Sequence, residues 1–154
     1  MAYASESDFE TYIRFIIETN ISALDKNIQV LTNKKAVDIL IHRKGEKSDL
    51  FFIEVKYHKM NHGRLGFGSN NGGGFQPEIL KGNFEYFENN LRWIIASEAH
   101  QPDKLLFLCS NTIRKYLSGG SIGDKFNNIQ TKIFQNEQFI SEEQFISELK
   151  DWLA

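Results

Sequence analysis

The chain has 154 residues, of which 41% are hydrophobic and 25% are charged, and its formal net charge is −2. This length supports one compact domain with a real core and is too short for two, so we expect residues 1–154 to form a single domain. The composition is that of an ordinary globular protein, and the net charge alone does not point to a nucleic-acid partner.

The sequence also limits where the protein is expected to work. No apolar run approaches the length of a membrane span, and the first residues lack the positive flank and apolar stretch of a signal peptide. The single cysteine, Cys109, excludes an internal disulfide and a cysteine-rich zinc site. We therefore expect a cytoplasmic protein with no membrane partner.

The first half of the chain predicts a helix followed by strands. Apolar residues at helical spacing predict a helix over 6–20, which Ser5 or Ser7 would cap. A short strand is expected over 28–31. Stronger strands are expected over 36–42 and 50–57, joined as a β-hairpin and apolar on both faces, as in a sheet covered by helices on each side.

The middle of the chain contains a glycine-rich segment. Residues 61–74 include six glycines and few core candidates, which predicts a long mobile loop of a kind that is usually functional. A long helix is then expected over 77–99, with Pro77 in its first turn. Its buried stripe would consist of Leu80, Phe84, Phe87, Leu91, Ile94 and Ile95.

The last part of the chain predicts one strand and several helices. The strand is expected over 104–110, and helices over 112–117 and 124–135. A final helix would begin at Ser141, where Ser-Glu-Glu-Gln forms a capping box. The whole order indicates a small α/β sandwich.

Two carboxylates interrupt the apolar strands where strand propensity disfavours them. Asp38 and Glu54 each stand in such a strand, and a buried carboxylate needs a compensating partner. Side-chain alternation puts Glu54 and Lys56 on one face, and the hairpin can bring Asp38 opposite or diagonal to Glu54. A salt bridge of Glu54 with Lys56 or Lys59 would be a simpler explanation, but it leaves Asp38 unexplained.

This arrangement of oxygen ligands suits magnesium. Mg²⁺ prefers hard oxygen ligands, which Asp38, Glu54 and the backbone carbonyl of Val55 would provide. Such a metal would stabilise the transition state of phosphate-ester hydrolysis and lower the pKa of its bound water. Lys56 would position or deprotonate that water, or neutralise charge on the phosphate.

Asp38, fifteen intervening residues and then Glu54-Val55-Lys56 resemble the PD-(D/E)XK nuclease superfamily, which includes many restriction endonucleases and recombination nucleases. The resemblance covers about residues 9–110, with Val37 where the motif has proline. It implies a restriction-endonuclease-like three-layer sandwich, with a central mixed sheet of about four or five strands flanked by helices. It also implies Mg²⁺-dependent hydrolysis of DNA to leave a 5′-phosphate, with Mn²⁺ as a substitute.

The resemblance implies roles for further residues. Glu10, in the first helix, would support the metal site, with Glu18 as the alternative. Gln76, at the entry to the helix after the Glu-x-Lys strand, would support the site and contact nucleic acid. The simpler alternatives are that Glu10 faces solvent and that Gln76 only begins the helix.

The segment after Glu54 is free of acidic residues as far as Pro77 and carries several cations. We expect Lys59, Arg64 and Asn70 to bind the DNA backbone, with the glycine-rich loop ordering around it. Phe67 and Phe75 could stack on bases. Ordinary solvated loops are the alternative.

The sequence leaves several functions open. A DNA endonuclease of restriction or anti-phage defence is the first hypothesis, and a nuclease of repair or recombination is the second. A non-catalytic nucleic-acid-binding module with the same fold and an enzyme acting on a small phosphoester are the rivals. Small nucleases of this type often act as dimers, which makes a homodimer one further expectation.

Overall fold

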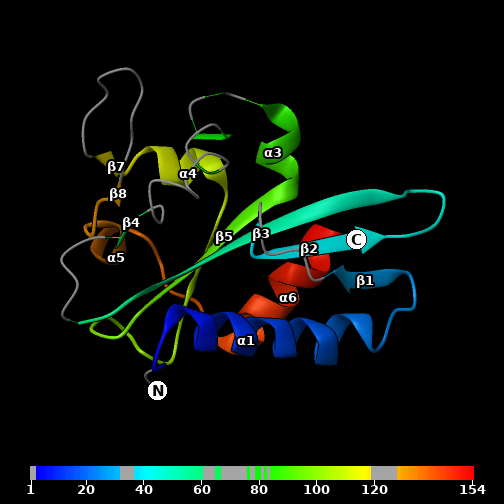
Figure 1. Cartoon of the computed structure of the whole chain (residues 1–154), viewed down its shortest axis with the longest axis horizontal. Helices are drawn as coiled ribbons and strands as arrows, with labels where there is room; N and C mark the ends of the chain where they lie inside the picture. The colour runs from blue at the N-terminus through cyan, green and yellow to red at the C-terminus, as the bar shows by residue number, and fades with distance from the viewer. Residues whose placement is uncertain are drawn as a thin grey trace.

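The computed structural model of the chain is shown in Figure 1. It describes residues 3–31, 37–60, 65–66, 76, 79–80, 82, 84–118 and 128–154. The predictions for Arg64, Asn70, Phe67 and Phe75 lie outside these residues.

A mixed sheet of five strands forms the centre of the described part of the chain. The strands lie side by side in chain order, and β3 and β5 are parallel while the other neighbouring pairs are antiparallel. They are β1 (Ile28–Leu31), β2 (Ile39–Arg43), β3 (Asp49–His58), β5 (Leu91–Ser97) and β6 (Leu106–Leu108). The prediction of an α/β fold around a mixed sheet of four or five strands is confirmed.

Helices α1 (Glu6–Ile17) and α6 (Glu142–Leu153) pack on one face of this sheet (Figure 1). Helix α1 continues into a π-helical turn, η1 (Glu18–Ser22). The capping hydroxyls are those expected, because Ser5 accepts a hydrogen bond from the backbone N–H of Asp8 and Ser141 accepts one from that of Gln144. Both helices therefore begin where their sequences predict.

The other face is covered by short elements (Figure 1). They comprise helices and a small antiparallel sheet in the order β4-β8-β7. They are β4 (Leu65–Gly66), α3 (Glu85–Asn90), α4 (Ser110–Arg114), β7 (Leu117–Ser118), β8 (Asn128–Ile129) and α5 (Ile133–Asn136). The central sheet, helices α1 and α6 on one face and the short elements on the other make three layers, which is compatible with a three-layer sandwich.

Alternate residues of the central strands enter two separate cores. On β3, Ile53 and Val55 face α1 and α6, whereas Phe52 packs against the opposite core. On β5, Ile94 joins the first core and Trp93 the second. The next two residues on the Phe52 face of β3 are Glu54 and Lys56, so two ionisable groups stand where the pattern calls for apolar ones.

The predicted helix over 77–99 is wrong in its second half. Residues Leu91–Ser97 form β5, which pairs in parallel with β3 at the centre of the sheet. Leu91, Ile94 and Ile95 have helical spacing, but they belong to a strand buried on both faces, which shows no apolar-polar alternation. Phe84, expected in the buried stripe, is 52% exposed.

Other predicted boundaries also need correction. The helix expected over 124–135 includes strand β8 and is helical only at Ile133–Asn136 in its described part. The glycine-rich segment, predicted to be a loop, contains β4, which pairs with β8. The strand expected over 36–42 begins only at Ile39, so Asp38 directly precedes it. Among the described residues, no helix has the length and apolar character to cross a membrane.

Arg114 joins α4 to the segment before α3. Its guanidinium donates to the backbone oxygens of Leu80 (3.0 Å), Gly82 (2.6 Å) and Ile79 (3.2 Å). Because these carbonyls would lose a charged donor, Arg114→Ala is expected to lower the free energy of unfolding by about 2 kcal/mol. Chemical denaturation measures this, with Lys115→Ala, at an exposed neighbour, as control. Equal losses in the two variants would contradict the assignment.

Candidate active site

Strand β3 continues past the point where β2 begins. The ladder ends at the pair Ile39 and Ile53, whereas β3 runs on to His58. A strand residue directs its N–H and C=O to the same neighbour, and the odd-numbered residues of β3 face β2. Val55 and Tyr57 therefore direct their N–H groups toward the side of β2, but beyond the last residue pair of the β2–β3 ladder.

Two carboxylates accept the hydrogen bonds of β3 where β2 no longer pairs with it. Asp38 Oδ2 accepts a hydrogen bond from the N–H of Val55 at 2.7 Å. Glu6 Oε2, from the first turn of α1, accepts one from the N–H of Tyr57 at 3.2 Å. The β2–β3 register, continued by one residue, puts Asp38 opposite Glu54. The prediction that Asp38 lies beside Glu54 is confirmed.

Glu54 is the most unusual group of this site because it is a carboxyl with 1% exposure. Burial raises its pKa well above its usual range; the Asp38 carboxyl raises it further and Lys56 lowers it. Its side chain is hydrogen-bonded to Asp38, yet Oε1 is buried with no hydrogen-bond partner among the described residues. Oε1 of Glu54 is therefore a buried oxygen that no hydrogen bond among the described residues compensates.

Lys56 is the nearest cation on the same face of β3. Its side chain is 3% exposed, and Nζ donates to the backbone oxygen of Gly66 at 3.0 Å. Gly66 belongs to β4, which is paired with Asn128 of β8. The small sheet thus holds the ammonium group, whose charge lowers the pKa of both Glu54 and Glu6.

Helix α1 contributes the remaining acidic groups. Glu10 forms an ion pair with Arg14 at 3.6 Å, and Arg14 also donates to the backbone oxygen of Asp38. Glu10 is therefore connected to Asp38 through Arg14, and its role at a metal site stays a prediction. Glu18 is exposed in η1, on the side of the sheet edge formed by β1.

Glu6 is the site residue that sequence reasoning missed. It accepts directly from β3, and burial raises its pKa although the residue keeps an exposed surface. A signal for it exists in the sequence, because Glu6 and Glu10 stand four residues apart on a helix and so share one face.

The proposed nucleic-acid contacts are only partly described. Lys59 Nζ donates to the backbone oxygen of Ala4 at 2.8 Å, so it points toward the start of α1. Gln76 is half-buried, and the described contacts include none between it and the carboxylates of Asp38 or Glu54. Its role, like those of Arg64 and Asn70, stays a prediction.

The fit of a metal to this site rests on two side chains and the backbone. Within the described ranges, no group of three or more His, Cys, Asp or Glu side chains is arranged to hold an ion. The carbonyl of Val55 points to the same side as its N–H, toward Asp38. Together with the unpartnered oxygen of Glu54, this gives a small set of hard oxygen donors, which fits Mg²⁺.

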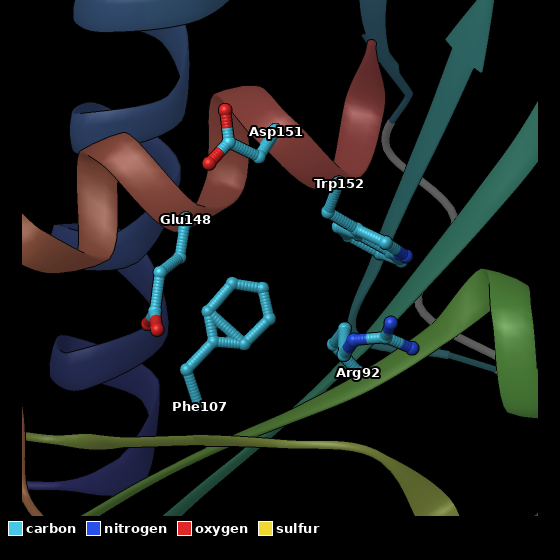
Figure 2. Close-up of a pocket in the computed structure, with 5 residues that line it drawn as sticks. All are labelled: Arg92, Phe107, Glu148, Asp151 and Trp152. Atoms are coloured by element: carbon cyan, nitrogen blue, oxygen red, sulfur yellow. The ribbon is translucent and has the colours of Figure 1, made fainter.

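A separate hollow of about 370 Å³ lies between α6 and the sheet (Figure 2). It is lined by Arg92, Phe107, Glu148, Asp151 and Trp152. The Arg92 guanidinium lies 5.1 Å from the centre of the Trp152 ring and donates to the backbone oxygen of Glu88. The contact between Arg92 and Trp152 fastens α6 to β5, and none of the predicted site residues lines the hollow.

Comparison with known proteins gives no assignment. No protein-family model matches the chain, and no curated protein is significantly similar to it. Any functional conclusion therefore rests on the residues and their geometry.

Proposed function

We propose that this protein is a magnesium-dependent nuclease of the PD-(D/E)XK type that hydrolyses phosphodiester bonds in DNA. The observation that carries the proposal is the pair formed by half-buried Asp38 and fully buried Glu54, with Oε1 of Glu54 lacking a hydrogen-bond partner among the described residues. Burial and the neighbouring Asp38 carboxyl make Glu54 costly to ionise. A divalent cation would remove both penalties.

Each residue would have a distinct role in such a site. Asp38, Glu54 and the Val55 carbonyl would hold the ion. When bound, Mg²⁺ or Mn²⁺ supplies the charge that polarises a phosphate oxygen and lowers the pKa of a water molecule. Lys56, anchored on Gly66, would neutralise negative charge on the phosphate as the ammonium ion or, as the neutral amine, accept a proton from the attacking water.

Further support comes from where the pair lies. Glu54 and Lys56 stand on the central strand of a mixed sheet with helical layers on its faces, which is compatible with the restriction-endonuclease-like fold. Glu10 and Glu6 approach from α1. DNA contacts by Lys59, Arg64, Asn70 and Gln76, a homodimer, and a restriction or anti-phage role belong to the same proposal.

The direct test is a cleavage assay with the intact chain. We expect supercoiled plasmid or single-stranded DNA to be cut in Mg²⁺ and in Mn²⁺ and to remain whole in EDTA, with 5′-phosphates on the products. RNA of the same sequence tests the choice of nucleic acid. Absence of cleavage in every metal condition would contradict the proposal, and DNA binding without cleavage would favour a non-catalytic module.

A further inference from the structure

An aromatic surface continues the face of β3 that carries Glu54 and Lys56. Side chains alternate along a strand, so Leu50 and Phe52 share this face with Glu54, and successive ones are about 7 Å apart. Helix α3 lies over the sheet beside β3 and β5 (Figure 1). We define the aromatic platform as Leu50, Phe52, Phe84, Tyr86 and Phe87.

The aromatic platform leaves large apolar side chains in water. Phe84 is 52% exposed, Tyr86 44% and Leu50 38%. Phe87 joins the rings into one surface, with its centre 5.6 Å from that of Phe52, 5.3 Å from Tyr86 and 6.3 Å from Phe84. A contiguous exposed patch of this kind on a globular protein usually marks a binding surface.

The exposed rings are held in place by their neighbours. The Tyr86 hydroxyl can donate its single proton to Asp49 Oδ1, at 3.3 Å, or to the backbone oxygen of Leu50, at 3.4 Å. The Phe84 ring lies against the backbone of Gly82, where a Cβ atom would stand only 2.1 Å from Phe84 Cε2. Gly82 therefore leaves room for this ring, and the platform loses little conformational freedom on binding a ligand.

The charges around the platform select the kind of ligand. None of its five members is cationic, and the acidic Asp49 and Glu85 lie next to it in the chain. The platform therefore offers a phosphate group no cationic side chain of its own, whereas every nucleobase has a face that stacks on an aromatic ring. In a duplex those faces are hidden in the base stack, so only unpaired bases can reach the platform.

We propose that the aromatic platform stacks unpaired nucleobases, and that the substrate is therefore single-stranded or locally unpaired DNA. This inference rests on the proposed nuclease function, because it joins the platform to the carboxylates of the same strand face. The phosphates next to the stacked bases would then run toward Glu54 and Lys56.

Fluorescence anisotropy with a labelled single strand and a matched hairpin duplex, in EDTA, tests the binding. Phe84→Ala and Tyr86→Ala are each expected to weaken single-strand binding about 5- to 20-fold, while Tyr86→Phe, which keeps the ring, binds like the wild type. Phe15→Ala is the matched control, since Phe15 is 63% exposed on α1 and belongs to the other layer. Circular dichroism checks that each variant is folded.

Salt dependence separates stacking from phosphate contact. Loss of a stacked base lowers affinity without changing the slope of log affinity against log salt, whereas loss of a phosphate contact makes that slope shallower. Wild-type affinity in the alanine variants, a shallower slope, or duplex bound as tightly as single strand would overturn the inference. So would wild-type self-association that Phe84→Ala abolishes while DNA binding is unchanged, because it would assign the surface to protein contact.

The two proposals fail in different ways. If the platform variants weaken single-strand binding but no DNA is cut in any metal, the stacking surface stands and the nuclease proposal fails. If DNA is cut, and the platform variants bind single strands with wild-type affinity and cut them at wild-type rates, the nuclease proposal stands and the stacking proposal fails.

Discussion

Replacing Asp38 with asparagine, or Glu54 with glutamine, is expected to lower metal-dependent DNA cleavage by at least about 100-fold. Each change keeps the size of the side chain but removes one of the two charges that would hold the cation. The Asp38→Asn side chain can still accept from the N–H of Val55 through its remaining carbonyl oxygen, so the end of the β2–β3 ladder is preserved. Initial rates on plasmid in Mg²⁺ measure the effect.

Matched controls separate loss of the site from loss of surface charge. Glu18→Gln and Asp151→Asn make the same chemical changes at exposed positions and are expected to cut at wild-type rates. Lys56→Met should lose activity and keep metal binding, because Lys56 is not among the proposed ligands. Full activity in Asp38→Asn or Glu54→Gln would refute the catalytic assignment.

The same Glu54→Gln variant is expected to be more stable than the wild type by about 1 to 3 kcal/mol at pH 7 without divalent ions. Burial and the Asp38 carboxyl hold the pKa of Glu54 well above its usual range, so ionising it in the folded protein is costly. A glutamine amide carries no charge and can donate a hydrogen bond to Asp38.

The sign of the pH dependence follows from this raised pKa. The folded wild type binds a proton on Glu54 more tightly than the unfolded chain does, so its stability falls as pH rises from the ordinary glutamate pKa through the raised one. The advantage of Glu54→Gln should therefore be small near pH 4 and grow toward neutral pH. Denaturant unfolding at a series of pH values measures it, and a pH-independent difference would contradict this account.

Magnesium should reverse the order of stability. A cation that binds only the folded state raises the melting temperature by an amount that grows with the ratio of its concentration to its dissociation constant. We expect Mg²⁺ to stabilise the wild type at pH 7 and to leave the melting temperatures of Glu54→Gln and Asp38→Asn unchanged. This readout does not depend on cleavage, so it tests the metal site even with the wrong nucleic acid.

The sequence predicts the regular parts of this fold well. Helix α1, strand β1 and helix α6 begin where caps and apolar spacing place them, because each has one apolar face or a clear boundary. Strand β5 was not predictable in this way. It is buried on both faces, so Trp93 and Ile94 enter different cores, and its apolar run fits helical spacing equally well.

The candidate site can be predicted from the sequence because its residues conflict with their surroundings. Asp38 and Glu54 interrupt apolar segments, and such a conflict can be recognised without knowing the fold. Glu6 has no such conflict, since an acidic residue in the first turn of a helix is ordinary. The exposed position of Phe84 and Tyr86 depends on where α3 begins and how it packs, which the local pattern does not determine.

The overhang of β3 beyond β2 has a further consequence for the solubility of the protein. An open strand edge with unpaired N–H groups can pair with a strand of another molecule and so start aggregation. Here the side chains of Asp38 and Glu6 occupy the N–H groups of Val55 and Tyr57 and add negative charge to that edge. The acidic groups of the site therefore also protect the sheet from intermolecular pairing. Asp38 and Glu6 thus have a structural role in addition to the proposed catalytic one.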